Sequence, residues 1–571
     1  MNMNKKTIIY QLLPRLFTNP IENCIPNGTI EENGVGKMND ITLKVLNSIN
    51  KLGITHIWYT GIIEHAQKTN YSKYGIVPDN PYIVKGNAGS PYAIKDYYDV
   101  DPDLSVNVAK RIDEFENLIK RTHDANMKVI IDFVPNHVAR QYNSDSKPVG
   151  IEDLGVGDDN TYFFKQSNNF YYIPRQQFAP NVDLGEGSDE YHEFPAKATG
   201  NDCFSAFPGI NDWYETVKLN YGVDYGDGSR NFDPIPNTWF KMLHILRFWA
   251  SKGIDGFRCD MAHMVPLEFW QWAISNVKKT YPEIIFIAEI YDTSLYRDFI
   301  YIGGFDYLYD KVTLYDTLRA VQCSNYSAAQ ITNCWQTVEG INGNMLNFLE
   351  NHDEQRFAST QYAGDAAIVI PSLIVSSMIN TGPMMIYAGQ ELGEPAADAE
   401  GYSGLDGRTT IFDYWSIPTL RRWYNNGNCD EKLLTSREVW LRNIYSKILN
   451  ICNQEKAISN GNFFDLMYVN YDNPSLNPHD HYVFLRNFEN ETLLIAVNFR
   501  SSSCDLKINI PRHAFNTLSI PEGKFEAVEL LSSDKNIKAF SSEIPFETFI
   551  QPYNAVVWKI NHKKSTQTAK K

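Results

Sequence analysis

One pattern recurs along most of the chain: an amphipathic helix, a short polar or glycine-containing turn, and then a compact apolar run. It is clearest over residues 107–137, "NVAKRIDEFENLIKRTHDANMKVIIDFVPNH", where Phe115, Leu118 and Ile119 repeat at helical spacing. The apolar run 129–134 follows at once and is interrupted by a single aspartate. Spacing of three and four residues predicts a helix, and the short apolar run predicts a buried strand.

The same unit appears in four further segments of the chain: 42–62, 237–260, 267–290 and 366–391. Alternating helices and fully buried strands predict an α/β fold with a parallel sheet that helices cover. The number of units favours a closed (β/α)8 TIM barrel over an open doubly wound sheet. No GxGxxG pattern follows the first strand, which argues against a dinucleotide-binding fold.

Two regions lack this pattern. Residues 139–215 follow the third predicted strand, are rich in Gly, Asn, Asp and aromatic residues, and are too long for an ordinary loop. Beyond residue 458, short alternating segments lie between turn signals and predict an all-β sandwich. We therefore predict four segments: a first barrel part (1–138), an inserted lobe (139–215), a second barrel part (216–455) and a C-terminal β-sandwich (456–562).

The charge balance argues against a nucleic-acid partner. Lys and Arg number 52 against 68 Asp and Glu, so the formal net charge is −16 at pH 7. A phosphate backbone is bound mainly by clustered cations, whereas a neutral polar ligand is compatible with this balance. The aromatic content of 13% is compatible with large cores or with rings that stack on sugars or bases.

The cysteines and the apolar segments bear on the cellular location of the protein. The eight cysteines form no CxxC pair and no compact cluster, which is typical of free thiols in a reducing environment. No segment approaches 18 consecutive apolar residues, and the apolar run near the N-terminus breaks at Pro14 without a cleavage site after it. These features predict a cytoplasmic protein with no membrane partner.

Chemically reactive side chains stand at the ends of four predicted strands. The four motifs are "VIIDFVPNHV", "GIDGFRCD", "IFIAEI" and "FLENHDEQR". A lone aspartate at a strand end is usually a turn or capping residue, and a lone histidine is usually a packing residue. Because the strands of a parallel barrel end on one face, four such motifs together predict a catalytic site there.

Two of these carboxyls suit glycosidic cleavage, which needs one carboxyl protonated and one ionised. Arg258 and Asp260 are two residues apart, so in a strand both side chains point the same way and the guanidinium would hold Asp260 ionised. Glu289 is enclosed by apolar neighbours with no cation beside it in the sequence, so burial would raise its pKa, as a general acid requires.

The four motifs, in this order, resemble the signature regions of the α-amylase family (glycoside hydrolase family 13, clan H). Other segments along the chain support the resemblance: "IIYQLLPRLF", "YAIKDYYDVDPDL" and "GPMMIYAGQELGE". The resemblance implies Asp260 as nucleophile, Glu289 as acid/base, and Asp353 as the residue that fixes and distorts the sugar ring. It also implies a retaining mechanism through a covalent glucosyl–enzyme, with the two reacting carboxyls roughly 5 Å apart.

The resemblance further implies side chains that contact or support the sugar in the cleavage subsite: Tyr92, Asp132, His137, Arg258, His263 and His352. Tyr92 would be the stacking ring, and Asp132 would support Arg258. Many members of the family carry Lys-His three and four residues after the nucleophile to grip the leaving-side sugar, whereas this chain has His263 and Met264 there.

The family resemblance also bears on calcium. In many α-amylases an aspartate after the inserted lobe binds a structural calcium together with the asparagine of the first motif, here Asn136. The matching segment "TVKLN" has Lys218 in place of that aspartate, and a cation there opposes calcium. We therefore expect no required cofactor; if calcium is bound, its ligands would be Asn136 and Asp183.

The sequence leaves several functions open. The leading hypothesis is a hydrolase that cleaves α-1,4 bonds of maltodextrins or starch, with an α-glucan oligosaccharide as its partner. A transglycosylase, transferring maltosyl or glucosyl groups with the same triad, is the alternative, because "CDMAHMVPLEFWQW" resembles the maltosyltransferase branch. A non-catalytic binding protein would be expected to lack a triad acid. The lobe aromatics, among them Phe163, Phe164 and Tyr171, could line glucan subsites or pack on one another.

Overall fold

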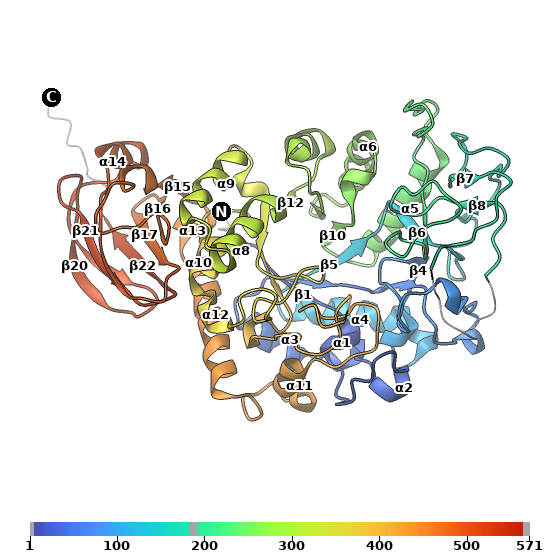
Figure 1. Ribbon diagram of the computed structural model, residues 1–571, viewed down its shortest axis with the longest axis horizontal. Coiled ribbons are helices and arrows are strands. Elements are labelled where there is room, and N and C mark those ends of the chain that lie inside the picture. The colour runs from blue at the N-terminus through green and yellow to red at the C-terminus, as the bar shows by residue number, and fades with distance from the viewer. Residues whose placement is uncertain (1–4, 183–190, 403, 563–571) are drawn as a thin grey trace.

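The computed structural model describes residues 5–182, 191–402 and 404–562, and its centre is a closed barrel of parallel strands (Figure 1). In chain order the barrel strands are β1 (Ile8–Leu12), β2 (His56–Tyr59), β5 (Lys128–Phe133), β10 (Gly256–Cys259), β11 (Ile285–Ala288), β12 (Tyr307–Tyr309), β13 (Met345–Phe348) and β14 (Met384–Tyr387). Each strand pairs with its chain neighbours, and β1 closes the ring by pairing with β14. The predicted (β/α)8 barrel is confirmed.

Amphipathic helices cover the barrel because each buries one face against the strands. In α4 the side chains of Phe115, Leu118 and Ile119 are buried, at the three- and four-residue spacing read from the sequence. The helices are α1 (Pro14–Phe17), α2 (Ile30–Asn33), α3 (Leu43–Asn50), α4 (Arg111–Asp124), α5 (Asn237–Ser251), α6 (Leu267–Lys278), α7 (Tyr296–Asp298), α8 (Asp316–Cys323), α9 (Ile331–Thr337), α10 (Ile370–Met378), α11 (Pro418–Tyr424), α12 (Ser436–Gln454), α13 (Lys456–Ser459) and α14 (Arg512–Leu518).

Two long segments that connect barrel elements lie at the C-terminal ends of the barrel strands. A hairpin of β3 (Ile63–His65) and β4 (Ile94–Val100) follows β2. The longer segment, between β5 and α5, forms the lobe: β6 (His137–Ala139) pairs with β9 (Thr216–Lys218), and β7 (Tyr172–Ile173) pairs with β8 (Ala196–Lys197). An apolar cluster of the described lobe residues, joined by Ile83 from the segment between β3 and β4, packs within the lobe.

The C-terminal part is built of antiparallel strands. One sheet has the order β15-β16-β17-β22-β19-β20, and β18 pairs with β21 in a second sheet. The strand bounds are β15 (Asn462–Asp465), β16 (His481–Phe488), β17 (Glu491–Asn498), β18 (Cys504–Ile508), β19 (Gly523–Glu529), β20 (Lys535–Phe540), β21 (Phe546–Ile550) and β22 (Asn554–Asn561). Figure 1 shows this part at the far side of the barrel from the lobe, where α10 contacts β17 and β22.

Over the described ranges, no helix combines the length and the apolar character needed to cross a membrane.

Candidate active site

One buried guanidinium joins the side chains at the ends of three barrel strands. The parallel register sets Arg258 of β10 beside Asp132 of β5. Arg258 Nη1 lies 2.8 Å from Asp260 Oδ1 and 3.4 Å from Asp132 Oδ1, and its Nη2 forms an ion pair of 2.8 Å with Glu289 Oε2. The structure therefore brings together the side chains that the sequence placed at separate strand ends.

The expectation that Glu289 has no cation beside it is wrong. Strand β11 pairs with β10, so Arg258, which is distant in sequence, reaches the Glu289 carboxyl from the next strand. Glu289 Oε2 also accepts a hydrogen bond of 2.8 Å from the backbone N–H of Met261, and Oε1 accepts one of 2.5 Å from the hydroxyl of Tyr291. Neighbours along a strand are visible in the sequence, whereas neighbours across the sheet are not.

The direction of the pKa shift of Asp260 also differs from the expectation. Burial raises the pKa of Asp260 well above its usual range, and the nearby Glu289 carboxyl raises it further. Arg258 lowers the pKa of Asp260 without outweighing these effects, because the same guanidinium is shared with Glu289 and Asp132. Burial raises the pKa of Asp132 to about 6. A single cation facing three buried carboxyls favours retention of a proton within the group.

A histidine at the end of β13 links Asp353 to an aromatic ring. The side-chain amide of Gln11 contacts His352 Nδ1 at 2.7 Å, so Nδ1 accepts and Nε2 carries the hydrogen. That Nε2 lies 2.6 Å from the Tyr92 hydroxyl and 3.1 Å from Asp353 Oδ2. Tyr92 stacks on His352 with ring centroids 5.2 Å apart. Burial holds the pKa of His352 well below its usual range, so the ring is neutral.

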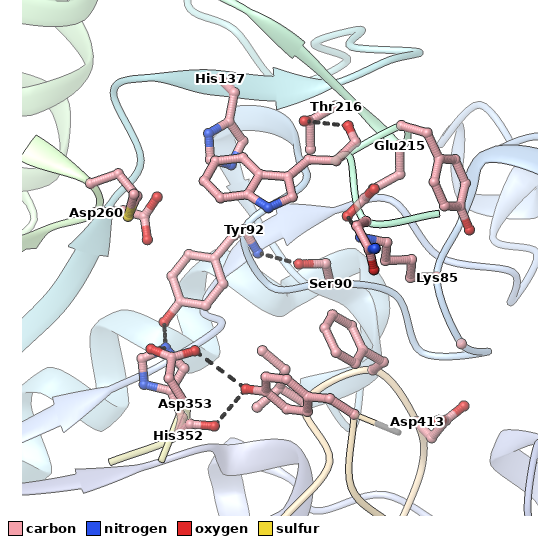
Figure 2. Close-up of a pocket in the computed structure, with 18 of the residues that line it drawn as sticks. Lys85, Ser90, Tyr92, His137, Glu215, Thr216, Asp260, His352, Asp353 and Asp413 are labelled. Atoms are coloured by element: carbon pink, nitrogen blue, oxygen red, sulfur yellow. Dashed lines mark hydrogen bonds and ion pairs between the residues drawn. The ribbon is translucent and has the colours of Figure 1, made fainter. Parts of the chain in front are cut away.

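Asp353 faces the same space as Asp260 (Figure 2), and its carboxyl is also in contact with Tyr402. The Tyr402 hydroxyl donates to the backbone carbonyl of His352 at 2.5 Å and lies 3.3 Å from Asp353 Oδ1. Burial and the charge of Glu289 raise the pKa of Asp353 to about 7. Asp353 therefore exchanges its proton near neutral pH.

These groups open onto a cavity of about 860 Å3 between the barrel mouth and the lobe. Six predicted site residues line it: Tyr92, His137, Asp260, Glu289, His352 and Asp353. Arg258 is buried and contacts Asp260 and Glu289 of the cavity lining, and the buried Asp132 contacts Arg258. His263 does not line the cavity; its ring lies beside Tyr291, with centroids 6.3 Å apart.

The cavity extends from the carboxyls to a charged pair at its other end. Lys85 Nζ lies 3.0 Å from Glu215 Oε1, and both side chains are drawn away from Asp260 in Figure 2. Trp213 also lines the cavity, with its ring centroid 5.1 Å from that of His137. Burial lowers the pKa of His137 to about 3, so this ring is neutral as well. The cavity walls thus offer one aromatic surface and several neutral hydrogen-bonding groups.

Sequence reasoning missed several side chains of the site. Tyr291 follows Glu289 by two residues, and the two-residue period of a strand was a signal that could have found it. Met261 adopts a left-handed conformation (φ 42°, ψ 44°) that is uncommon for a residue with a side chain, and this turn aims its N–H at Glu289. The sequence contains no pattern that predicts this turn. It also contains none that predicts the contact of Tyr402, from a distant loop, with Asp353.

The lobe aromatics pack on one another. Tyr171 is buried and contacts Phe163 and Phe164, with ring centroids 5.9 and 6.3 Å apart. None of these three rings lines the cavity. The sequence left two roles open for these rings, lining glucan subsites or packing on one another. For these three residues the structure shows packing.

Asn136, one of the two residues named for calcium, is already bound to a cation of the chain itself. The side-chain oxygen of Asn136 accepts a hydrogen bond from the ammonium of Lys218, and the Asp202 carboxylate lies 2.6 Å from the same ammonium. Calcium binds six to eight oxygens, and here the oxygens around Asn136 already surround a fixed cation. Asp183, the other residue named for calcium, lies outside the described residues.

Another acidic group lies away from the cavity. In the part of the chain that the structure describes, Glu64, Asp96 and Asp99 are the one set of three potential metal ligands whose oxygens lie within 4.8 Å of one another. Arg111 already pairs with Asp99 there. This group is separate from the site above.

Taken together, two carboxyls on neighbouring nitrogens of one guanidinium, a third carboxyl that titrates near neutrality, and a stacking ring form a site for acid–base and nucleophilic chemistry on a polar ligand. A family model described as "Alpha amylase, catalytic domain" matches residues 11–431. The chain is 22% identical over 512 residues to alpha-amylase 2 of Dictyoglomus thermophilum, covering 89% of this chain and 71% of that protein.

A transferase is also among the similar proteins. The alpha-1,4-glucan:maltose-1-phosphate maltosyltransferase of Picrophilus torridus is 23% identical over 261 residues, covering 45% of this chain and 31% of that protein. Among solved structures, a maltogenic alpha-amylase from Thermotoga neapolitana has a TM-score of 0.62 at 18% identity, covering 98% of this chain and 99% of that one. The alpha-amylase of Geobacillus thermoleovorans, solved with acarbose, has a TM-score of 0.61 at 19% identity, covering 98% of each chain. At 18% and 19% sequence identity, these structural similarities show that the fold is shared.

Proposed function

Because the chain belongs to the α-amylase family of glycoside hydrolases, we propose that it hydrolyses α-1,4-glucosidic bonds of maltodextrins or starch with retention of configuration. The observation that carries this proposal is the placement of Asp260 and Glu289 on adjacent nitrogens of Arg258 at the cavity wall. A shared guanidinium brings the two carboxyls to the same side of the cavity, which supports the short separation that a retaining mechanism requires.

In the proposed first step, Asp260 attacks the anomeric carbon and the bond from that carbon to the leaving oxygen breaks. Glu289 gives its proton to the leaving oxygen, and a glucosyl ester of Asp260 is left behind. The raised pKa values of Asp260 and Asp353 support the presence of a proton in this group, which must be on Glu289 when Asp260 attacks.

In the second step, a water molecule attacks the same carbon while Glu289 takes up one of its protons, and the Asp260 carboxylate leaves. The hydrogen bonds from Tyr291 and from the Met261 N–H suit this stage, because they hold the orientation of Glu289 whether it has given or regained its proton. Arg258 disperses the negative charge that returns to Asp260.

The sugar in the cleavage subsite would be held by groups around Tyr92. Its ring offers a stacking face, and neutral His137 and His352 offer hydrogen bonds to hydroxyl groups. Asp353 would fix and distort the sugar ring whose glycosidic bond is cleaved. His263, placed beside Tyr291, would act on the leaving-side sugar through Tyr291. The acarbose complex of the Geobacillus relative and the maltose complex of AmyP, another structural neighbour, support an oligosaccharide ligand.

A transglycosylase is the alternative function. The similarity of the chain to a maltosyltransferase supports this alternative. The two activities share Asp260, Glu289 and Asp353 and differ in whether water or a sugar reaches the glucosyl–enzyme. Maltoheptaose should be incubated with and without added maltose, and both reducing ends and product lengths should be measured. A gain in reducing ends without acceptor supports the hydrolase; no gain, with longer products, would establish the transferase instead.

The same assay tests a binding protein without catalysis. The Asp260→Asn variant serves as the matched control, because it keeps the size of the side chain and removes the nucleophile. Wild-type protein that binds maltoheptaose but changes it no faster than this variant would contradict any catalytic function.

We also propose a reducing, cytoplasmic location. The structure has all eight cysteines as free thiols, three of them buried, and free thiols persist where cellular reductants keep them so. Cell fractionation followed by immunoblotting tests this proposal, and recovery of the protein from the culture medium would contradict it.

A further inference from the structure

A buried lysine ammonium lies at the junction of the lobe and the barrel mouth. Lys218 is 2% exposed, and its Nζ has three oxygen partners. It donates to the side-chain oxygen of Asn136, pairs with Asp202 Oδ1 at 2.6 Å, and lies 3.3 Å from the backbone carbonyl of Met264. The ring of Tyr225 lies 5.6 Å from the same nitrogen, as in a cation–π contact.

The three oxygens come from separate parts of the chain. Asn136 lies in the segment between β5 and β6, Asp202 belongs to the lobe, and Met264 ends the short helical turn Ala262–Met264 that follows the proposed nucleophile. Lys218 itself is in β9 at the base of the lobe. One charged group therefore holds the lobe to two loops of the barrel mouth.

Two of these contacts are made by residues next to the cavity wall. Asn136 precedes His137, which lines the cavity, and its side-chain NH2 donates to the carbonyl of Gly200 in the lobe at 2.7 Å. Met264 lies four residues after Asp260 in the same loop. A shift of the ammonium would therefore move both the ring of His137 and the loop that carries the nucleophile.

The ammonium is paired in this position. Burial lowers the pKa of Lys218, while the Asp202 carboxylate raises it again. A buried charge is tolerated when an opposite charge and hydrogen-bond acceptors surround it. The oxygen-lined position thus has the features of a small cation site whose cation is a side chain of the chain itself.

We propose that Lys218 is a positioning residue whose ammonium supplies, from within the chain, the cation that joins the lobe to the catalytic loops, and that the enzyme therefore needs no calcium at this place. This assignment concerns stability and geometry, so it can fail while hydrolysis of maltodextrins stands, and the reverse is also possible.

Three proteins test the proposal: wild type, Lys218→Met, and Lys241→Met as the matched control. Lys241 Nζ also joins the lobe to the barrel, because it donates hydrogen bonds to the carbonyl of Asp153 and to the side-chain oxygen of Asn169. Neither Lys241 nor these two partners line the cavity. We expect Lys218→Met to lower kcat on maltoheptaose by about 10- to 100-fold with a smaller change in KM, because misplaced catalytic groups act on the reacting state. Lys241→Met should keep kcat within about twofold of wild type.

A second variant reverses the charge. Lys218→Asp would place a carboxylate beside Asn136, Asp202 and the Met264 carbonyl, which is an oxygen set that suits calcium. We expect calcium to raise the Tm of this variant by several degrees and to restore part of its kcat, and EDTA to remove both effects. The same additions should leave the Tm of wild type and of Lys241→Met unchanged, since ligand binding stabilises only a protein that binds.

The proposal would be overturned by a marked fall in wild-type Tm on adding EDTA, or by a Lys218→Met variant with wild-type kcat and Tm. If Lys218→Met does not fold, the calcium response of Lys218→Asp and the EDTA response of wild type still decide. A Lys218→Asp protein that calcium leaves unchanged in Tm and kcat would also count against the assignment.

Discussion

Replacing Arg258 with methionine tests the electrostatic account of the site most severely. The guanidinium is 1% exposed and faces Asp132, Asp260 and Glu289, all of them buried. The Arg258→Met variant keeps an apolar stem of similar length and removes the only cation that contacts these carboxyls among the described residues. Removing one partner of a buried ion pair costs about 3–5 kcal/mol, which is the loss we expect in the free energy of unfolding at pH 8.

The loss should depend on pH in a defined direction. The folded-state pKa values of Asp260 and Asp132 already lie above their unfolded values, so the folded state binds extra protons and the free energy of unfolding falls as pH rises. Without Arg258 these pKa values rise further. At pH 5 a larger fraction of these carboxyls is protonated than at pH 8. Each additional bound proton changes the free energy of unfolding by up to about 1.4 kcal/mol per pH unit. We therefore expect the loss at pH 5 to be smaller by about 2–4 kcal/mol.

Urea unfolding followed by fluorescence at pH 5 and pH 8 measures both losses. Arg356→Met is the matched control, because Arg356 is equally buried but pairs with the single carboxyl of Glu350, 3.1 Å away, outside the cavity. Its loss should change less with pH than that of Arg258→Met. Equal losses at pH 5 and pH 8 in Arg258→Met would refute the reasoning that one cation balances several buried acids.

Four further predictions follow from single side chains. Asp260→Asn should lower kcat by roughly 10⁴-fold or more with an unchanged Tm, and residual activity within tenfold of wild type would exclude Asp260 as nucleophile. Tyr291→Phe, which removes the hydroxyl hydrogen bond to Glu289, should lower kcat about 5- to 50-fold in steady-state assays and shift its pH profile; an unchanged profile would argue against that role. Trp213→Ala should raise KM for maltoheptaose about tenfold with little change in kcat, and an unchanged KM would remove Trp213 from the sugar contacts. Because burial raises the pKa of Asp310 to about 7, the folded state holds its proton above the unfolded pKa, and stability from this group is lost as pH rises from about 4 to 7. In urea unfolding over that range Asp310→Asn should therefore show a shallower decline than wild type, and parallel curves would contradict the shift.

The fold could be predicted because its signals are local. The helical spacing of Phe115, Leu118 and Ile119 and the apolar run after it directly reflect one helix packed on one strand. Repetition of that unit leaves few topologies, and the rule that parallel strands end on one face then gathers Asp260, Glu289 and the other strand-end groups.

The parts that could not be predicted depend on contacts across the sheet or on unusual backbone conformations. Arg258 and Glu289 lie on adjacent strands, so the cation beside Glu289 became visible only with the register of β10 and β11. The left-handed turn at Met261 is imposed by the surrounding loop, since methionine has no preference for it. The sequence showed that Lys218 is a cation at an unexpected position, but its oxygen partners come from three separate segments.

The central claim, retaining cleavage with Asp260 as nucleophile and Glu289 as acid/base, is tested most directly by the configuration of the first product. Proton NMR of maltoheptaose hydrolysis, recorded within the first minutes, distinguishes the α from the β anomer of the newly formed reducing end before mutarotation mixes them. Two displacements at the same carbon predict the α anomer. Initial formation of the β anomer would contradict the mechanism, because it would require a single displacement by water in place of two displacements at the same carbon.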